Sequence, residues 1–332
     1  MEKICVVRLS ALGDVVMMIP LIKMLRKNFP KSQITWIIEE RFYPIVEKLE
    51  GIDFIRVNKI NTLREFFKIR ADLKKCSFDV LLATQASMSA HLFYLMLKAK
   101  RKIGYDAIRG KDLHSLFINE KIPFVKEHTV DGFLRFAKYL GVKEQTIDGK
   151  IPLDSQDYNL ADNTIGTNTF YVMNPFSSKR ERDWVLDRYV QVATQIHAQT
   201  NFILVLTGSK ADWKKCEELK NKIPGSVMNM AGKTSLRQLA AILDRAKFVI
   251  SPDTGPLHIA SSMNTPVIGL YSASPSETTG PYFSREYTID KHQLALTKFC
   301  KGKNLWNKRI YNDEVMKLIT VDDVLEKVQL VI

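Results

Sequence analysis

A stretch in the last third of the chain, SPDTGPLHIA at residues 251–260, places an acid and a base five residues apart. Its Asp-Thr-Gly triplet is the motif with which aspartic proteases position a catalytic carboxylate. That mechanism needs two carboxylates sharing a proton, and the sequence contains a single such triplet. The stretch instead predicts a helix starting at Pro256 and capped by Asp253 and Thr254. Helix N-termini bind anions, so His258, one turn inside, is a candidate ligand contact; a plain structural cap is the alternative.

Two further loops resemble nucleotide-binding motifs without matching them. AGKTSL, residues 231–236, contains Gly-Lys-Thr, but Val227 stands where a P-loop needs its first glycine. Thr234 and Ser235 are instead predicted to cap the following helix, in a loop that is also a candidate ligand contact. The first strand is followed by SALGDVV rather than by the G-x-G-x-x-G of dinucleotide-binding proteins.

The SALGDVV loop still contains a carboxylate with two possible roles. Asp14 stands beside Gly13 at the predicted start of the first helix. As a structural residue it would face the positive end of the helix dipole. As a functional residue it would act as a general base. A fourth loop, NPFSSKRERDW at residues 174–184, offers two hydroxyls and three cations that suit phosphate oxygens, although a solvated basic loop has the same composition.

Short β-branched runs alternate with amphipathic segments along the whole chain, and this pattern predicts an α/β protein with parallel sheets. Strands are expected near residues 4–9, 34–38, 80–84, 202–208, 248–253 and 266–272. The polar stretch at residues 143–168 reads as the link between two doubly wound domains facing a cleft. Ligands bind such sheets beyond the carboxyl ends of the strands, where all of the loops above are expected.

Composition limits the classes of function. The 332 residues have a net charge of +13, with twelve bases against four acids from Lys59 to Lys111 and five bases without an acid from Lys298 to Arg309. An anionic partner is expected, but no zinc-finger, RNP-like or basic-zipper motif favours nucleic acid. Four scattered cysteines predict free thiols and no metal site. The start of the chain lacks the features of a signal peptide and no apolar run is long enough to cross a bilayer, so a cytoplasmic location is expected.

Taken together, the motifs resemble the lipopolysaccharide heptosyltransferases of glycosyltransferase family nine. The resemblance follows family order and spacing over nearly the whole chain and is strongest at residues 230–282; the other matching segments are 8–22, 174–184, 206–212 and 315–328. It implies the GT-B architecture of two Rossmann-like domains. Residues 1–160 would bind the acceptor, 161–318 the nucleotide sugar, and a C-terminal helix within 319–332 would pack back on the first domain.

The resemblance also implies a reaction. An inverting transferase would move heptose from ADP-L-glycero-β-D-manno-heptose to the Kdo-bearing inner core of lipid A, without a metal or other cofactor. It would act at the cytoplasmic face of the bacterial inner membrane, attracted to an anionic surface. A family member using another nucleotide sugar or core acceptor is the alternative, and a non-catalytic binding protein of the same fold is a third hypothesis.

Site residues follow from the resemblance position by position. Asp14 matches the general base, and Arg182 stands where many relatives have a lysine at the diphosphate. Donor contacts are expected from Ser177, Ser178, Gly208, Thr234, Ser235, Asp253, Thr254, Gly255, His258, Thr279 and Gly280. Acceptor contacts are expected from Ser10, Gly13, Gln85, Arg109 and His128. The cysteine-rich segment of some relatives is reduced here to Cys300.

Overall fold

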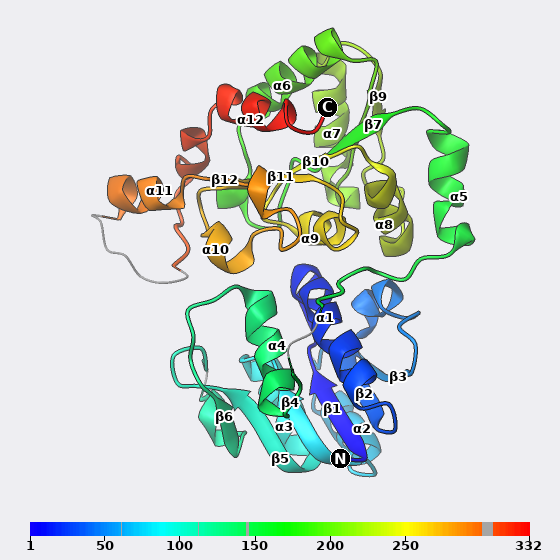
Figure 1. The fold of residues 1–332 in the computed structure, drawn as a ribbon, viewed down its shortest axis with the longest axis vertical. Coiled ribbons are helices and arrows are strands. Elements are labelled where there is room, and N and C mark those ends of the chain that lie inside the picture. The colour runs from blue at the N-terminus through cyan, green and yellow to red at the C-terminus, as the bar shows by residue number, and fades with distance from the viewer. Residues whose placement is uncertain (61, 112, 144–145, 301–307) are drawn as a thin grey trace. The chain divides into compact units, whose positions relative to one another are not determined.

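The chain divides into two compact units, residues 1–152 and 153–332 (Figure 1). The structure is a computed structural model that describes residues 1–60, 62–111, 113–143, 146–300 and 308–332. The boundary expected between residues 160 and 161 lies inside helix α5 (Ser155–Thr164), which packs on α8 (Leu236–Arg245) of the second unit. A buried ion pair joins the two helices, because the Arg237 guanidinium donates to Asp157 Oδ1 at 2.8 Å.

The first unit is a six-stranded, wholly parallel sheet with helices on its faces. Along the chain its elements are β1 (Lys3–Val7), α1 (Leu12–Asn28), β2 (Gln33–Glu39), the 3-10 helix η1 (Glu40–Ile45), β3 (Ile52–Val57), α2 (Leu63–Leu73), β4 (Ser77–Ala83), α3 (Met88–Met96), β5 (Lys98–Tyr105), the 3-10 helix η2 (His114–Leu116), β6 (Glu120–Ile122) and α4 (Thr129–Tyr139). The strand order is β3-β2-β1-β4-β5-β6.

Alternation along the strands distributes the helices over the two faces of this sheet. Cys5 and Val7 of β1 belong to a buried cluster that also contains side chains of α2 and α3. Helices α1 and α4 pack on each other (Figure 1). The run of buried residues from Val15 to Ile22 keeps α1 buried around almost its whole circumference, as helices covering a parallel sheet often are.

The second unit repeats this design. Its elements are α5, β7 (Phe170–Met173), η3 (Arg180–Arg182), α6 (Leu186–Gln199), β8 (Ile203–Leu206), η4 (Lys210–Asp212), α7 (Trp213–Lys222), β9 (Val227–Asn229), α8, β10 (Val249–Pro252), α9 (Gly255–Ser262), β11 (Val267–Tyr271), α10 (Ser276–Thr279), η5 (Arg285–Tyr287), β12 (Ile289–Asp290), α11 (His292–Phe299), η6 (Val315–Leu318) and α12 (Val321–Val328). The parallel order is β12-β11-β10-β7-β8-β9, which repeats the order of the first sheet.

The C-terminal helix packs on elements of the second unit, and its expected packing on the first unit stays a prediction. Helix α12 contacts α6 and β11. Its apolar face is buried in the core of that unit through Val324 and Val328, followed by Val331. The chain is anchored just before the helix, where the Trp184 indole donates to the Ile319 carbonyl oxygen at 3.1 Å. The apolar face of α12 is therefore buried next to the strands that precede it in the chain.

In both sheets the strand order reverses at one place, between β1 and β4 in the first and between β7 and β10 in the second. This order confirms two Rossmann-like, doubly wound units. Loops that follow the strands on either side of such a reversal form the usual ligand crevice.

All four cysteines are free thiols, as expected. Among the described residues, no helix combines the length and apolar character needed to span a membrane.

Candidate active site

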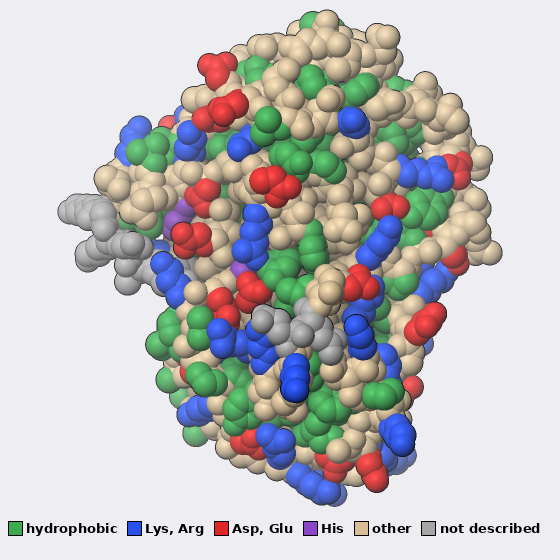
Figure 2. Space-filling view, viewed as in Figure 1, with side chains coloured by type: hydrophobic (Ala, Val, Ile, Leu, Met, Phe, Trp, Pro, Cys, Tyr) green, Lys and Arg blue, Asp and Glu red, His purple; other side chains and the backbone are tan. Residues whose placement is uncertain are grey.

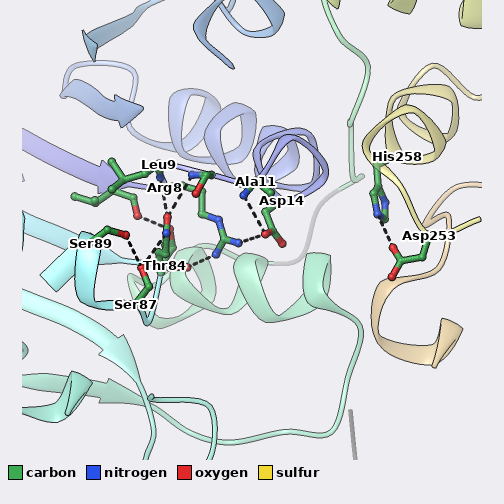
Figure 3. Close-up of polar contacts among 12 residues, drawn as sticks. Arg8, Leu9, Ala11, Asp14, Thr84, Ser87, Ser89, Asp253 and His258 are labelled. Carbon is green, nitrogen blue, oxygen red and sulfur yellow. Dashed lines mark hydrogen bonds and ion pairs between the residues drawn. The ribbon is translucent and has the colours of Figure 1, made fainter. Parts of the chain in front are cut away.

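The reversal point of the first sheet holds Asp14 in the first turn of α1. Asp14 Oδ2 accepts the backbone N–H of Ala11 at 3.3 Å and forms an ion pair with Arg8 (Figure 3). The Asp14 side chain is 33% exposed, whereas that of Arg8 is 11% exposed. The carboxylate therefore stabilises the helix start, as its structural role requires, and still presents a face to solvent on which a substrate proton can be accepted.

Arg8 is a site residue that the sequence analysis did not identify. Its guanidinium donates to the Thr84 carbonyl oxygen at 2.8 Å and lies 5.3 Å from the centre of the Phe133 ring. These contacts hold a half-buried cation directly behind Asp14. The sequence did contain a signal for this role. Arg8 is a cation at the end of an apolar strand, six residues before the Asp14 carboxylate, and such a cation is unusual unless it is paired.

Gln85, at the end of the neighbouring strand, holds the loop that leads to Asp14. Its Oε1 accepts the N–H groups of Leu9 at 2.8 Å and Ser10 at 3.4 Å, and its Nε2 donates to Ser87 Oγ at 3.0 Å. The side chain is buried. Gln85 thus shapes the loop on which Ser10 and Gly13 lie half-buried, which is a positioning role.

The reversal point of the second sheet is organised around Asp253. Its Oδ2 accepts a hydrogen bond from Ser274 Oγ at 2.9 Å and lies 3.2 Å from Arg182 Nη1, while Oδ1 lies 3.5 Å from His258 Nε2. Only 6% of Asp253 is exposed. Figure 3 shows the His258 ring directed at this carboxylate.

The prediction that Asp253 and Thr254 cap helix α9 through their side chains is wrong. Thr254 occupies the N-cap position but makes no capping hydrogen bond, because its hydroxyl contacts Ser251 Oγ at 2.9 Å and Asn174 Nδ2 at 3.4 Å. The Asp253 carboxylate is used by Arg182 and its other partners. The N–H groups of the first turn, beginning at Gly255, are thus left for another acceptor, which is what an anion-binding helix start requires.

Arg182 connects the loops after β7 and β10. Besides its ion pair, its Nη1 donates to the Asp253 backbone oxygen at 2.9 Å. The loop before it is held by Ser177, whose N–H donates to Asp183 Oδ1 at 2.7 Å and whose Oγ accepts the Lys179 N–H at 2.9 Å. Ser178 is exposed beside it. The loop therefore presents hydroxyl and cationic groups on a fixed backbone.

Surrounding charges set the pKa of Asp253. Burial alone would raise the pKa of this carboxyl, but the hydrogen bond with His258, the charge of Arg182 and the Ser274 hydroxyl outweigh burial and hold the pKa below its ordinary value. Asp253 is therefore ionised throughout the neutral range and fixes the Arg182 cation in place.

This lowered pKa predicts a pH-dependent contribution to stability. A carboxyl whose folded pKa lies below its unfolded value of about 3.9 stabilises the protein above that pH, and the contribution is lost as the pH falls through the folded pKa. We expect Asp253→Asn to lower the free energy of unfolding by about 1–3 kcal/mol at pH 7 and by less below about pH 4. Urea denaturation from pH 7 to pH 3 measures this difference. Exposed Asp187→Asn is the control, and a difference that stays constant with pH contradicts the prediction.

Two loops beside β8 and β9 approach each other closely. The Gly232 N–H donates to the Gly208 carbonyl oxygen at 3.0 Å, and a Cβ at Gly232 would lie 2.6 Å from Lys210 Cα. Gly232 also has a φ of +69°, which favours glycine.

Ser235 caps α8, as predicted, by accepting the Gln238 N–H at 3.2 Å. Thr234 lies half-buried next to it.

Residues 66–308 match the family model for glycosyltransferase family 9 (heptosyltransferase). The chain is also 31% identical to the lipopolysaccharide core heptosyltransferase OpsX of Haemophilus influenzae, over 98% of this chain and 95% of that protein. The chain belongs to glycosyltransferase family 9. It is a glycosyltransferase, and the predicted family is confirmed.

Solved structures agree with this family 9 assignment at the level of fold. A family 9 glycosyltransferase from Veillonella parvula has a TM-score of 0.81 at 21% identity, covering 99% of this chain and 97% of that one. Heptosyltransferase WaaC of E. coli, solved with ADP, has a TM-score of 0.75 at 19% identity and covers both chains completely. The GT-B fold expected from the sequence is thereby confirmed.

Two predicted acceptor residues of this glycosyltransferase are engaged within the first unit. Arg109 donates from Nε to Asp106 Oδ2 at 2.6 Å and from Nη2 to the Pro123 oxygen at 2.9 Å, with its side chain 11% exposed. His128 is buried and caps α4 by accepting the Val130 N–H at Nδ1. Both hold the chain around β6 and α4, and their contact with the acceptor stays a prediction.

Residues Thr279 and Gly280 close helix α10. The Tyr271 hydroxyl donates to the Thr279 oxygen at 2.7 Å, and the Gly280 N–H donates to the Ser276 oxygen at the same distance. A Cβ at Gly280 would lie 2.6 Å from that oxygen, so a glycine fits this turn best. Their visible role is to shape the segment after β11.

Within the ranges that the structure describes, no group of three or more His, Cys, Asp or Glu side chains is placed to hold a metal ion.

Proposed function

We propose that this glycosyltransferase moves L-glycero-D-manno-heptose from ADP-heptose to the Kdo-bearing inner core of lipid A. Membership of the heptosyltransferase family and the 31% identity to a lipopolysaccharide core heptosyltransferase support the donor and acceptor class. The proposal depends on the different functional groups that lie at the reversals of strand order in the two sheets. One reversal offers an accessible carboxylate backed by a cation, and the other a fixed cation beside an uncapped helix start.

In the proposed reaction Asp14 removes a proton. It accepts the proton of the acceptor hydroxyl as that oxygen attacks the anomeric carbon of the heptose. Arg8 keeps the Asp14 carboxylate in one orientation, and Gln85 fixes the loop from which it projects. A single displacement forms the new glycosidic bond as the bond to ADP breaks, so the anomeric configuration inverts.

The negative charge that develops on ADP is stabilised by groups of the second unit. Arg182 is held by Asp253, and the first-turn N–H groups of α9, beginning at Gly255, are not capped by Thr254. His258 is oriented by the same aspartate. We infer that the diphosphate binds to these groups together with the hydroxyls of Ser177 and Ser178. The remaining proposed donor contacts, on the adenosine and sugar sides, are Gly208, Thr234, Ser235, Thr279 and Gly280.

We propose that the enzyme works without a metal and as a peripheral protein on the inner face of the bacterial inner membrane. Arg182 and the helix start supply the positive potential that a cation would otherwise provide. A lipid-anchored acceptor requires access to the membrane surface, and the net charge of +13 favours an anionic leaflet. Lys and Arg side chains are spread over the visible face of each unit (Figure 2). Within the base-rich run from Lys298 to Arg309, residues 301–307 lie outside the described residues.

Turnover with purified ADP-heptose and Kdo-lipid A tests the proposal. We expect release of ADP coupled to glycosylation of the acceptor, with equal rates in the presence and absence of EDTA. ADP-glucose and UDP-glucose serve as competing donors. Preferred turnover of another nucleotide sugar would support the alternative, a family 9 transferase with a different donor. Binding of ADP-heptose without any turnover would instead indicate a non-catalytic binding protein.

A further inference from the structure

Helix α3 carries an apolar stripe on its solvent side. Met88, Leu92 and Leu95 follow one another at spacings of four and three residues, which places them on one face of the helix. Met88 is 57% exposed and Leu95 is 64% exposed. Leu92 between them is partly buried and packs against the core, whereas the exposed Met88 and Leu95 favour a non-aqueous neighbour.

The 3-10 helix η2 extends this stripe sideways. Leu113 and Leu116 are 68% and 73% exposed on either side of buried His114. The His114 ring is joined to His91 of α3 by a 3.0 Å contact between Nδ1 and Nε2, and Phe117 stacks on the same His91 ring at 4.5 Å. Because this buried contact fixes η2 against α3, the leucines of both elements belong to one surface.

Helix α2 supplies positive charge on the same side of the sheet. Its inner residues, Phe66, Ile69 and Leu73, pack on or within the core cluster that also contains the inner residues of α3. Its outer face and the two residues after its end are exposed at helical spacing: Arg64, Phe67, Lys68, Ala71, Lys74 and Lys75. The acids Glu65 and Asp72 on this helix leave it with an excess of bases.

This surface begins next to the catalytic loop. The N-cap of α3 is Ser87, which accepts the side-chain N–H of Gln85, and Gln85 in turn accepts the N–H groups that precede Asp14. A lipid-anchored acceptor whose polar part reaches Asp14 therefore has its apolar anchor directed toward a region that starts at Met88. The connection runs through hydrogen bonds within the first unit.

We propose that the exposed faces of α2, α3 and η2 form a docking surface for an anionic phospholipid bilayer. Four exposed bases, Arg64 and Lys68 on α2 with Lys74 and Lys75 just after it, attract anionic headgroups. The exposed leucines and methionine beside them enter the interface, as in other interfacial amphipathic segments. The charge complementarity selects a bilayer over an apolar protein partner. The inference deepens the proposed function, on which it rests for the membrane-anchored acceptor.

Vesicle flotation of the full chain tests the docking surface. Vesicles of phosphatidylcholine are compared with vesicles of equal parts phosphatidylcholine and phosphatidylglycerol. We expect the protein to float only with the anionic vesicles. Reversing two charges with Lys68→Glu and Lys74→Glu should lower the partition coefficient about tenfold or more, and so should Leu95→Glu with Leu116→Glu. The matched controls, Lys214→Glu with Lys222→Glu and Leu294→Glu, change exposed residues of the second unit and should float like the wild type.

Activity assays separate docking from catalysis. Both surface variants should keep the wild-type kcat with a water-soluble, deacylated Kdo acceptor and lose turnover with an acceptor embedded in anionic vesicles. Equal flotation of wild type and surface variants would overturn the inference, as would equal binding to neutral vesicles. Loss of flotation by the surface variants alone would uphold it even if ADP-heptose proved not to be the donor, because flotation involves no sugar transfer.

Discussion

We expect Asp14→Asn to lower kcat about 10³-fold while leaving ADP binding unchanged. The substitution keeps the shape of the side chain and removes its ability to accept the proton of the acceptor hydroxyl. It also leaves Arg8, which is only 11% exposed, without its anionic partner. Steady-state turnover with both substrates saturating measures the chemical loss, and calorimetric titration with ADP measures donor binding.

Asp131→Asn is the matched control for this substitution. Asp131 also lies in the first turn of a helix of the first unit, so the control removes a comparable interaction with a helix dipole. It should leave kcat near the wild-type value. Thermal unfolding of both variants shows whether the fold is retained. A folded Asp14→Asn enzyme with kcat within a few-fold of the wild type would assign the base to another residue.

The second large effect is expected from Arg182→Met, which lowers kcat by about 10²–10³-fold. Arg182 donates to the Asp253 backbone oxygen and pairs with its carboxylate, so its cation is fixed before the donor binds. A preorganised cation stabilises the leaving diphosphate without reorganising during the reaction. Single-turnover rates with ADP-heptose isolate this step from product release.

Two companion variants interpret the result for Arg182. Arg180→Met removes a cation from the same loop, but that side chain is 88% exposed and should contribute little. Arg182→Lys keeps the charge, so we expect kcat within about tenfold of the wild type. If Arg180→Met proves as damaging as Arg182→Met, the general charge of the loop matters and the fixed pairing with Asp253 does not.

The sequence was sufficient to predict the α/β class, the two Rossmann-like halves and the family. Alternating strand and helix patterns depend on short-range periodicity, which a single chain displays directly. The loops SALGDVV, NPFSSKRERDW and SPDTGPLHIA could be placed beyond strand ends for the same reason. The observed strand orders show why these loops matter, since each follows a strand at a reversal of its sheet.

The partners of the site residues could not be predicted, because they come from distant parts of the chain. The Asp253 carboxylate was expected to cap its own helix, yet Ser274 and Arg182 approach it from other loops and compete successfully for its oxygens. The position of the Arg8 guanidinium depends on the pairing of β1 with β4, because that pairing places the Thr84 carbonyl oxygen within its reach. Local propensity carries no information about such contacts.

The sequence by itself determined which residues could do chemistry in this protein and in what order they occur. The tertiary structure alone decided which of them stay open to a substrate. Arg109 and His128 have the right chemical types, and the fold also engages them in hydrogen bonds around β6 and α4. Asp14 remains one-third exposed, with the half-buried Arg8 paired to it from behind. Burial and hydrogen-bond competition are properties of the folded chain, and they separate a candidate residue from a usable one.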